Sequence, residues 1–500
     1  MLLHFAQVVS CCLVFRVQEV ETMNGKRVFS TIALTLAGST LCAGLVLLAG
    51  CPSETTTSSS PTVATRAISG ALNGGQQPVE NSTVTLYAAG LGIMGASVVA
   101  TATTDANGQF IFPSFTCPST PMYVVAEGGN PGFAPGTDNT AIHMMAALGD
   151  CSAMPSFVNI NEVTTVAAAY ALNGFIGGSG CVNCGAGLPG SVSNVHGKNP
   201  GLINAFSMAA RLADVSLGTA SPPLPSNAAC ALATPPANCG LVKRLSSLAN
   251  SLAACINTTS AASAQCTELF DCATPGAIFS GGACTAGAGY TKASDTLQAL
   301  LYIARNPAQV GIVGVYDVAT KNVVFTPDLS AAPIDWTLSL NVTGGGLDGP
   351  VDIAIDADGH VWVANALNSG SISEFLPDGT AVSPGDGYPW FGIDSPVEIA
   401  IAADGHVWVT QYFYRILEYQ PDGTTGGIGY LGDASVVYAP IAIAADGHVW
   451  VAGAGAFANV GDYLPSGSFV SSYTGGGLSS SPSGIAIDAD GHVWIANNGN

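Results

Sequence analysis

Basic residues are scarce in this chain. Lysine and arginine together number 12 against 33 aspartates and glutamates, which gives a formal net charge of −21. Binding nucleic acid through its phosphates needs clustered basic side chains, so the composition excludes that class of partner. Charged residues of both signs make up only 9% of the sequence. Such a composition favours an exported protein rich in strands and loops over a cytosolic enzyme.

Recognisable catalytic motifs are missing as well. The sequence contains no Gly-x-Ser-x-Gly, His-Glu-x-x-His or phosphate-binding Walker loop. We predict no catalytic residue, no resident metal and no cofactor, and whether the chain is an enzyme stays open, with the balance towards a protein that is not one.

The N-terminus indicates export. Lys26 and Arg27 precede an apolar stretch, Val28–Leu48, and Leu48-Ala49-Gly50-Cys51 follows it. This arrangement resembles the signal of bacterial lipoproteins, which implies cleavage before Cys51 and lipidation of that residue. The alternative is an uncleaved transmembrane anchor, because the apolar stretch is long enough to span a bilayer. Either way we expect a location in the bacterial cell envelope, lipid-anchored at the outer membrane, periplasm or cell surface, or otherwise secretion.

The resemblance to a lipoprotein signal implies two segments at the beginning of the chain, a signal peptide and a linker. Residues 1–50 are predicted to be a signal peptide whose true start is Met23, and residues 51–66 a polar linker. Ten of the 14 cysteines follow Cys51, and an even number in an exported chain predicts disulfides. Cys181 and Cys184 have the spacing of a redox pair, but a local structural disulfide is the simpler interpretation because no βαβ pattern surrounds them.

Two domains are predicted between the linker and the C-terminal third. Residues 67–129 alternate as strands do, with an Asp105–Gly108 hairpin turn, and predict a small β-sandwich. The pattern from Gly70 to Phe110 resembles the carboxypeptidase-regulatory-like (transthyretin-like) modules, which implies a spacer or stalk. Residues 130–330 change to helical periodicity, with stripes such as Leu241–Cys255, and predict a mainly helical, cysteine-containing domain.

One sequence motif occurs four times near the C-terminus. Its histidines lie 46, 42 and 44 residues apart, at His360, His406, His448 and His492. Each copy reads as a hairpin with an Asp-Gly turn, and Pro-Asp-Gly or Pro-Ser-Gly marks a second hairpin after it. Two hairpins make a four-stranded blade, so residues 331–500 predict a β-propeller with the repeated tryptophans between blades. The fold class is therefore multidomain: β-sandwich, disulfide-containing α domain, then a propeller.

The repeated Ile-Ala-Ile-x-x-Asp-Gly-x-Val-Trp-Val and the Pro-Asp-Gly-Thr turn resemble the NHL-repeat and streptogramin-lyase propellers. That resemblance implies about six blades, so we expect that the ring is incomplete in this sequence. Thr337–Leu347 matches Ser468–Leu478, so Trp336–Gly346 is predicted to be an outer strand. The resemblance is specific for fold and not for activity, and no catalytic residue is transferred from it.

The repeated histidines could converge on a metal ion, but identical placement in every blade favours a role in blade structure. The repeated aspartates are explained by turn chemistry. Residues that break the repeat are better candidates for a ligand site: Trp390, Phe391, Tyr412, Tyr414 and Arg415. An aromatic cluster with one arginine suits a sugar or peptide, although extra packing between blades would use the same residues.

Two functions remain open. The first is a lipid-anchored binding protein for an unknown protein, peptide or glycan. The alternative is a propeller enzyme of the streptogramin-lyase or lactonase type, acting on a lactone or glycan.

Overall fold

The computed structural model describes residues 20–21, 27–28 and 65–497, except 93, 178–193, 223, 368–369, 389–394, 413–414, 431–439, 454–458 and 479–481. The described part of the predicted signal peptide is one short pair of strands, β1 (Val20–Glu21) and β2 (Arg27–Val28). The predicted linker is described only at Thr65 and Arg66, which begin a strand, and Cys51, Cys181 and Cys184 lie outside the described residues. Everything that follows concerns the second of the two units of the chain, Val63–Asn500.

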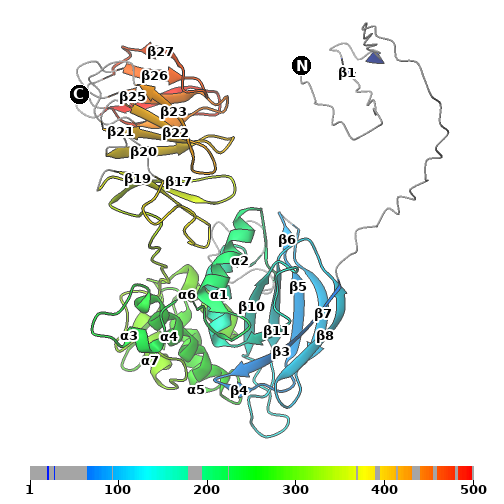
Figure 1. Ribbon diagram of the computed structural model, residues 1–500. Helices are drawn as coiled ribbons and strands as arrows, with labels where there is room; N and C mark the ends of the chain where they lie inside the picture. Colours follow the sequence, from blue (N-terminus) through cyan, green and yellow to red (C-terminus); the bar gives the residue numbers. More distant parts are fainter. Residues whose placement is uncertain are drawn as a thin grey trace, which may run out of the picture. The chain divides into compact units, whose positions relative to one another are not determined.

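Two sheets form the first part of this unit (Figure 1). One has the order β10-β9-β5-β7, and the other has the order β11-β3-β4 with β8 paired to β3. Their strands are β3 (Thr65–Gly74), β4 (Gln77–Pro78), β5 (Thr83–Ala88), β7 (Ser97–Thr103), β8 (Gln109–Thr116), β9 (Met122–Glu127), β10 (His143–Gly149) and β11 (Phe157–Ile160). A short parallel pair joins β6 (Gly90–Leu91) to β12 (His196–Gly197).

The sheets extend past residue 129, where the sequence predicts a change to a helical domain. Strand β10 pairs with β9, and β11 pairs in parallel with β3. One hydrophobic core runs through these strands and the helices, from Ile68 to Trp336. The boundary expected at residue 130 therefore falls inside a continuous sheet. The sequence does not indicate this continuation of the sheet because of strand β10. Its sequence His-Met-Met-Ala-Ala-Leu-Gly is buried along its length and lacks the alternation that marks a half-buried strand.

Seven helices follow in the described residues of this part. They are α1 (Glu162–Leu172), α2 (Gly201–Leu212), α3 (Asn227–Cys230), α4 (Cys239–Ile256), α5 (Ala264–Ala273), α6 (Thr296–Arg305) and α7 (Ile312–Thr320). Helix α1 begins at Asn161, whose side chain accepts a hydrogen bond from the Thr164 backbone N–H at 3.0 Å. Helices α1, α2 and α6 pack against β10 and so cover one edge of the sandwich.

Short hairpins connect these helices: β13 (Ala213–Asp214) with β14 (Thr219–Ala220), and β15 (Ile278–Ser280) with β16 (Ala283–Thr285). The prediction of disulfides is confirmed for the described cysteines, which pair as Cys117–Cys151, Cys230–Cys239, Cys255–Cys266 and Cys272–Cys284. Within the same residues, no helix is both long and apolar enough to cross a membrane.

Four small antiparallel sheets form the C-terminal part, and we call them blades 1 to 4 (Figure 1). Blade 1 contains β17 (Pro350–Ile355), β18 (Val361–Asn365) and β19 (Ser371–Phe375). Blade 2 contains β20 (Pro396–Ile401), β21 (Val407–Gln411), β22 (Arg415–Tyr419) and β23 (Thr425–Tyr430). Blade 3 contains β24 (Ile441–Ile443), β25 (Val449–Gly453), β26 (Asn459–Tyr463) and β27 (Phe469–Tyr473). Blade 4 contains β28 (Pro482–Ile487) and β29 (Val493–Asn497).

The predicted hairpin with the Asp-Gly turn is present in all four blades, whereas the predicted four strands are present in blades 2 and 3 of the described residues. The turn glycines Gly359, Gly405, Gly447 and Gly491 have φ values of 86°, 88°, 88° and 84°, which a residue with a Cβ adopts at a cost. The first strands of successive blades lie side by side, because β17 contacts β20, β20 contacts β24, and β24 contacts β28.

Residues 337–349, all of which are described, carry no strand, so the outer strand expected over Trp336–Gly346 is not formed. Trp336 is fully buried in the first core instead. Its indole N–H donates to the Ile312 carbonyl at 3.3 Å, and the Tyr170 hydroxyl donates to its carbonyl at 2.7 Å. Trp336 therefore fixes the start of this segment to the helices, where its ring is buried and its indole N–H has a partner.

Two of the repeated tryptophans pack between blades as predicted, whereas Trp450 of blade 3 is half-buried and stacks on Tyr473 of its own blade. Trp362 of blade 1 packs in a cluster with Ile399, Val407 and Tyr419 of blade 2. Trp408 of blade 2 packs in the same way against blade 3. Trp494 of blade 4 is 64% exposed.

Candidate functional site

Each repeated histidine lies against a carboxylate of its own blade. The Nδ1 atom of His360 lies 2.6 Å from Glu374 Oε1, and that of His448 lies 2.6 Å from Asp462 Oδ1. His406 makes the equivalent contact with Glu418. These acidic partners stand on the third strand of their blades. The histidines of blades 1 to 3 therefore link the second and third strands of one blade.

The acidic partners were detectable in the sequence, because each precedes an aromatic residue shortly before the second turn: Glu374-Phe375, Glu418-Tyr419 and Asp462-Tyr463. The predicted site residues did not include this second repeated position, although it supplies the carboxylate partner of each histidine in blades 1 to 3.

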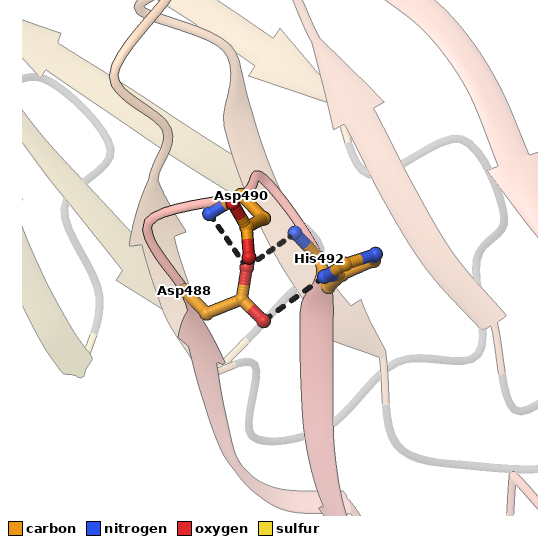
Figure 2. Close-up of side chains that lie close together, drawn as sticks. All are labelled: Asp488, Asp490 and His492. Carbon is orange, nitrogen blue, oxygen red and sulfur yellow. Dashed lines mark hydrogen bonds and ion pairs between the residues drawn. The ribbon is translucent and has the colours of Figure 1, made fainter.

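Blade 4 brings Asp488, Asp490 and His492 together (Figure 2). Asp488 Oδ1 accepts hydrogen bonds from the backbone N–H groups of Asp490 and His492, at 3.0 and 2.8 Å. Its Oδ2 lies 3.0 Å from His492 Nδ1 and accepts from the indole N–H of Trp494 at 2.9 Å. The Trp494 hydrogen bond, followed by the one from His492, lowers the pKa of Asp488 to about 2.

This cluster is the one group of three potential metal ligands that the described part of the chain brings within reach of a single ion. The same turn recurs in blade 1, where Asp356 accepts from the His360 backbone N–H at 2.8 Å and from the Trp362 indole at 3.0 Å. Both oxygens of Asp488 thus take part in a turn that blades 1 and 4 share, whereas Ala402 and Ala444 stand at this position in blades 2 and 3.

Two carboxylates on neighbouring first strands depart from the repeat. Asp352 and Glu398 stand at a position that Pro440 and Gly484 occupy in blades 3 and 4. Asp352 Oδ2 accepts from the Ile399 backbone N–H at 2.8 Å, and Glu398 Oε2 accepts from that of Ile441 at 3.1 Å. Burial raises the pKa of Glu398, the Ile441 N–H opposes this shift, and the charge of Asp352 adds to it. Each carboxylate therefore joins its blade to the next one.

The predicted aromatic cluster lies largely outside the described residues, which contain neither Trp390, Phe391 nor Tyr414. Of the five candidates, Tyr412 and Arg415 are described, and both are half-buried. The Tyr412 backbone N–H donates to the Ser395 carbonyl at 3.0 Å, and Arg415 begins strand β22. The ligand site proposed for this cluster remains a prediction.

An apolar cavity of about 590 Å³ lies between blade 1 and the helices. Blade 1 contributes one wall with Ile353, Val361, Val363 and Phe375. The other walls come from the segment after Trp336 and from α1, α2 and α6, with the side chains of Leu338, Leu340, Val342, Tyr170, Met208 and Leu212. The described side chains that line it include no charged residue.

A second cavity, of about 600 Å³, lies between α2 and the loop after β10. It has a mixed lining, with Ile203 and Phe206 on one side and the carboxylates of Asp150 and Asp214 on the other. Hydrogen bonds from Ser152 lower the pKa of Asp150, so this carboxylate stays charged at neutral pH. The two cavities therefore differ in the chemistry that they offer.

No protein family and no curated protein matches the chain. Solved structures match it in part. The virginiamycin B lyase of Staphylococcus aureus is 22% identical over 30% of this chain and 49% of its own, with a TM-score of 0.27. A gluconolactonase of Xanthomonas campestris is 15% identical over 31% of this chain and 57% of its own, with a TM-score of 0.25. The chain spans about half the length of these structures. At such TM-scores the similarity carries no argument about residues or activity.

Proposed function

We propose that this chain is an extracytoplasmic binding protein, anchored to the membrane by a lipid on Cys51, and that the apolar cavity beside blade 1 is its ligand site. Disulfides support a location outside the cytoplasm, because reducing conditions inside the cell keep thiols free. The resemblance of the stretch from Lys26 to Cys51 to a lipoprotein signal supports the proposed anchor.

The cavity is the observation that carries the proposal. Its volume of about 590 Å³ lies within the usual range for small-molecule sites, about 300–1,000 Å³. Its lining is apolar with few polar groups, as such sites are. Binding rather than chemistry is favoured because the repeated histidines and the turn aspartates Asp356 and Asp488 already have partners within their blades.

A propeller enzyme of the streptogramin-lyase or lactonase type, acting on a lactone or glycan, is the second candidate. The observation that favours it is the pair Asp352 and Glu398, two carboxylates that break the repeat on adjacent first strands. Glu398 is a half-buried carboxyl with a raised pKa, which suits proton transfer. Loss of lactone or glycan turnover in Glu398→Gln, with ligand binding retained, would favour this candidate.

The binding site is tested with a neutral fluorescent probe, N-phenyl-1-naphthylamine, titrated into the full chain. We expect saturable binding that Ile353→Glu weakens at least tenfold, because a carboxylate is costly to bury in an apolar site. Ile353 is 60% exposed, so the substitution is tolerated by the fold. The matched control is Ile203→Glu in the second cavity, which should bind the probe as the wild type does. Loss of binding in the control alone would show that the site is elsewhere.

A further inference from the structure

We propose that the second cavity, of about 600 Å³, binds a small organic cation that carries a primary ammonium group on an apolar body. This site goes beyond the proposed function and is independent of the cavity beside blade 1. Four features of the second cavity carry the proposal: its position, two carboxylates, a buried hydroxyl and an apolar wall.

The second cavity lies on the side of helix α2 that faces away from the cavity beside blade 1. Successive residues of an α-helix are about 100° apart around its axis. Ile203, Ser207 and Ala210 therefore share one face of α2, and they line the second cavity. Met208 and Leu212 lie on nearly the opposite face and line the first cavity. The described lining of the second cavity includes no blade residue, so the site does not depend on the propeller.

Two aspartates of the lining are held in the same way, because each is followed two positions later by a serine. Asp150 Oδ1 accepts hydrogen bonds from the backbone N–H and the hydroxyl of Ser152, at 2.7 and 2.5 Å. Asp214 Oδ1 accepts from the same two groups of Ser216, at 2.8 and 2.6 Å. These bonds fix both carboxylates and use the same oxygen of each.

The other oxygen of each carboxylate, Oδ2, has no hydrogen-bond or ion-pair partner among the residues that the structure describes. The described lining also contains no basic side chain. Arg66 reaches the loop after β10, but its Nη1 donates to the carbonyls of Cys151 and Met154. The two negative charges therefore have no counter-charge in the lining, and an ammonium ligand would pair with them through charge-assisted hydrogen bonds.

A buried hydroxyl independently indicates a polar ligand. Ser221 lines the cavity and is 6% exposed. Its backbone N–H donates to the Leu212 carbonyl at 3.2 Å, whereas its hydroxyl has no hydrogen-bond partner within the described part of the chain. Burying a polar group without a hydrogen bond is costly. A ligand can supply the missing bond, and an ammonium group has three N–H donors for this hydroxyl and the two carboxylates.

The rest of the lining selects the body of the ligand. Phe206 is 4% exposed, Ile203 is 45% exposed, and Leu148, Pro155 and Val215 extend the apolar wall. An apolar wall with a few polar groups is typical of small-molecule sites of this volume. A bare metal ion would leave the wall unused, and the described residues bring three potential metal ligands within reach of one ion only in blade 4. We therefore assign the cavity to an organic cation.

Isothermal titration calorimetry of the full chain tests the ligand class with three compounds that share one ring. 2-Phenylethylammonium is positive, 2-phenylethanol is neutral and 3-phenylpropionate is negative. The first should bind about tenfold more tightly than 2-phenylethanol, because its N–H groups form charge-assisted hydrogen bonds, and 3-phenylpropionate should not bind. Ethylammonium has the charge without the ring and should bind about tenfold more weakly than 2-phenylethylammonium, because it leaves the apolar wall in water.

Variants of the lining locate the site. Asp150→Asn and Asp214→Asn should each weaken 2-phenylethylammonium binding about tenfold, and Ser221→Ala about threefold. Asparagine keeps an oxygen acceptor for the serine, so both turns should persist, and thermal unfolding checks this. The matched control is Asp105→Asn, whose carboxylate accepts from two backbone N–H groups at 2.8 Å in a turn outside the cavity. It removes the same charge and should leave binding unchanged.

Three results would overturn the proposal. If Asp105→Asn weakens binding as much as Asp150→Asn, the net charge of −21 attracts the amine and the cavity does not. If the wild type binds 2-phenylethanol as tightly as 2-phenylethylammonium, the cavity does not recognise charge, and this comparison holds even where a variant does not fold. If calcium chloride gives binding and 2-phenylethylammonium does not, the carboxylates form a metal site. None of these results bears on the cavity beside blade 1, which N-phenyl-1-naphthylamine tests.

Discussion

Glu162 shows how one residue can make stability depend on pH. It is fully buried at the start of α1, where its Oε1 accepts a hydrogen bond from the Gly75 backbone N–H at 2.6 Å. Its Oε2 has no hydrogen-bond partner within the part of the chain that the structure describes. Burial raises the pKa of Glu162 from 4.5 to about 8, while the Gly75 N–H opposes that shift. The folded chain therefore holds this proton at neutral pH.

A folded-state pKa above the unfolded value means that the unfolded chain loses the proton first. Stability should therefore fall as the pH rises from 4.5 to about 8, by roughly 1 kcal/mol per pH unit. Glu162→Gln keeps an acceptor for Gly75 and cannot ionise, so it should lack this decline. Urea unfolding at pH 5 and pH 8 measures the difference, with Glu80→Gln as the control. A wild type equally stable at both pH values would contradict the prediction.

At the scale of the element, a blade is completed by its neighbour. Trp362 is 1% exposed because blade 2 covers it, and Asp352 of the same blade bonds to the backbone of blade 2. Trp494, at the equivalent position in blade 4, is 64% exposed. The same residue type at the same repeat position therefore contributes very differently to stability.

Trp362→Ala should destabilise the contact between blades 1 and 2 by about 3–5 kcal/mol, as the loss of a buried aromatic side chain does. Trp494→Ala should cost less than about 1 kcal/mol, because most of its ring is already in water. Hydrogen exchange of the β20 and β21 amides reports on this contact. Equal protection of these amides in the two variants would show that the indole of Trp362 does not hold the blades together.

The sequence predicted the blades well, because an Asp-Gly turn between alternating apolar residues is a local signal that recurs four times. Strand β10 was not predicted, because its continuous apolar run reads equally as a buried helix. Trp336 was assigned to a blade by its neighbours in sequence, whereas its contacts with Ile312 and Tyr170 are tertiary. The cavity brings together Tyr170, Leu340 and Ile353, and no local pattern connects residues so far apart in the chain.

At the scale of the whole molecule, the expected lipid decides where the binding site operates. Metabolic labelling with palmitate should mark the wild type and should not mark Cys51→Ala, since the lipid is attached to that residue. Cys42→Ala is the matched control, because Cys42 lies in the apolar stretch that cleavage removes. Two acyl chains or more would make the anchoring stable, so the labelled protein should sediment with membranes. Equal labelling of wild type and Cys51→Ala would refute the anchor.

The packing of Trp362 and Trp408 on the following blades also sets an order of assembly during synthesis. Trp362 and Trp408 leave the ribosome before the blades that cover them, and successive repeats are 42–46 residues apart. At a synthesis rate of about 5–20 residues per second, each of these indoles stays exposed for roughly 2–9 s before the blade that packs on it has been made. During synthesis of these blades, the blade made last therefore exposes its indole. A chaperone that protects the growing chain would bind at that exposed indole.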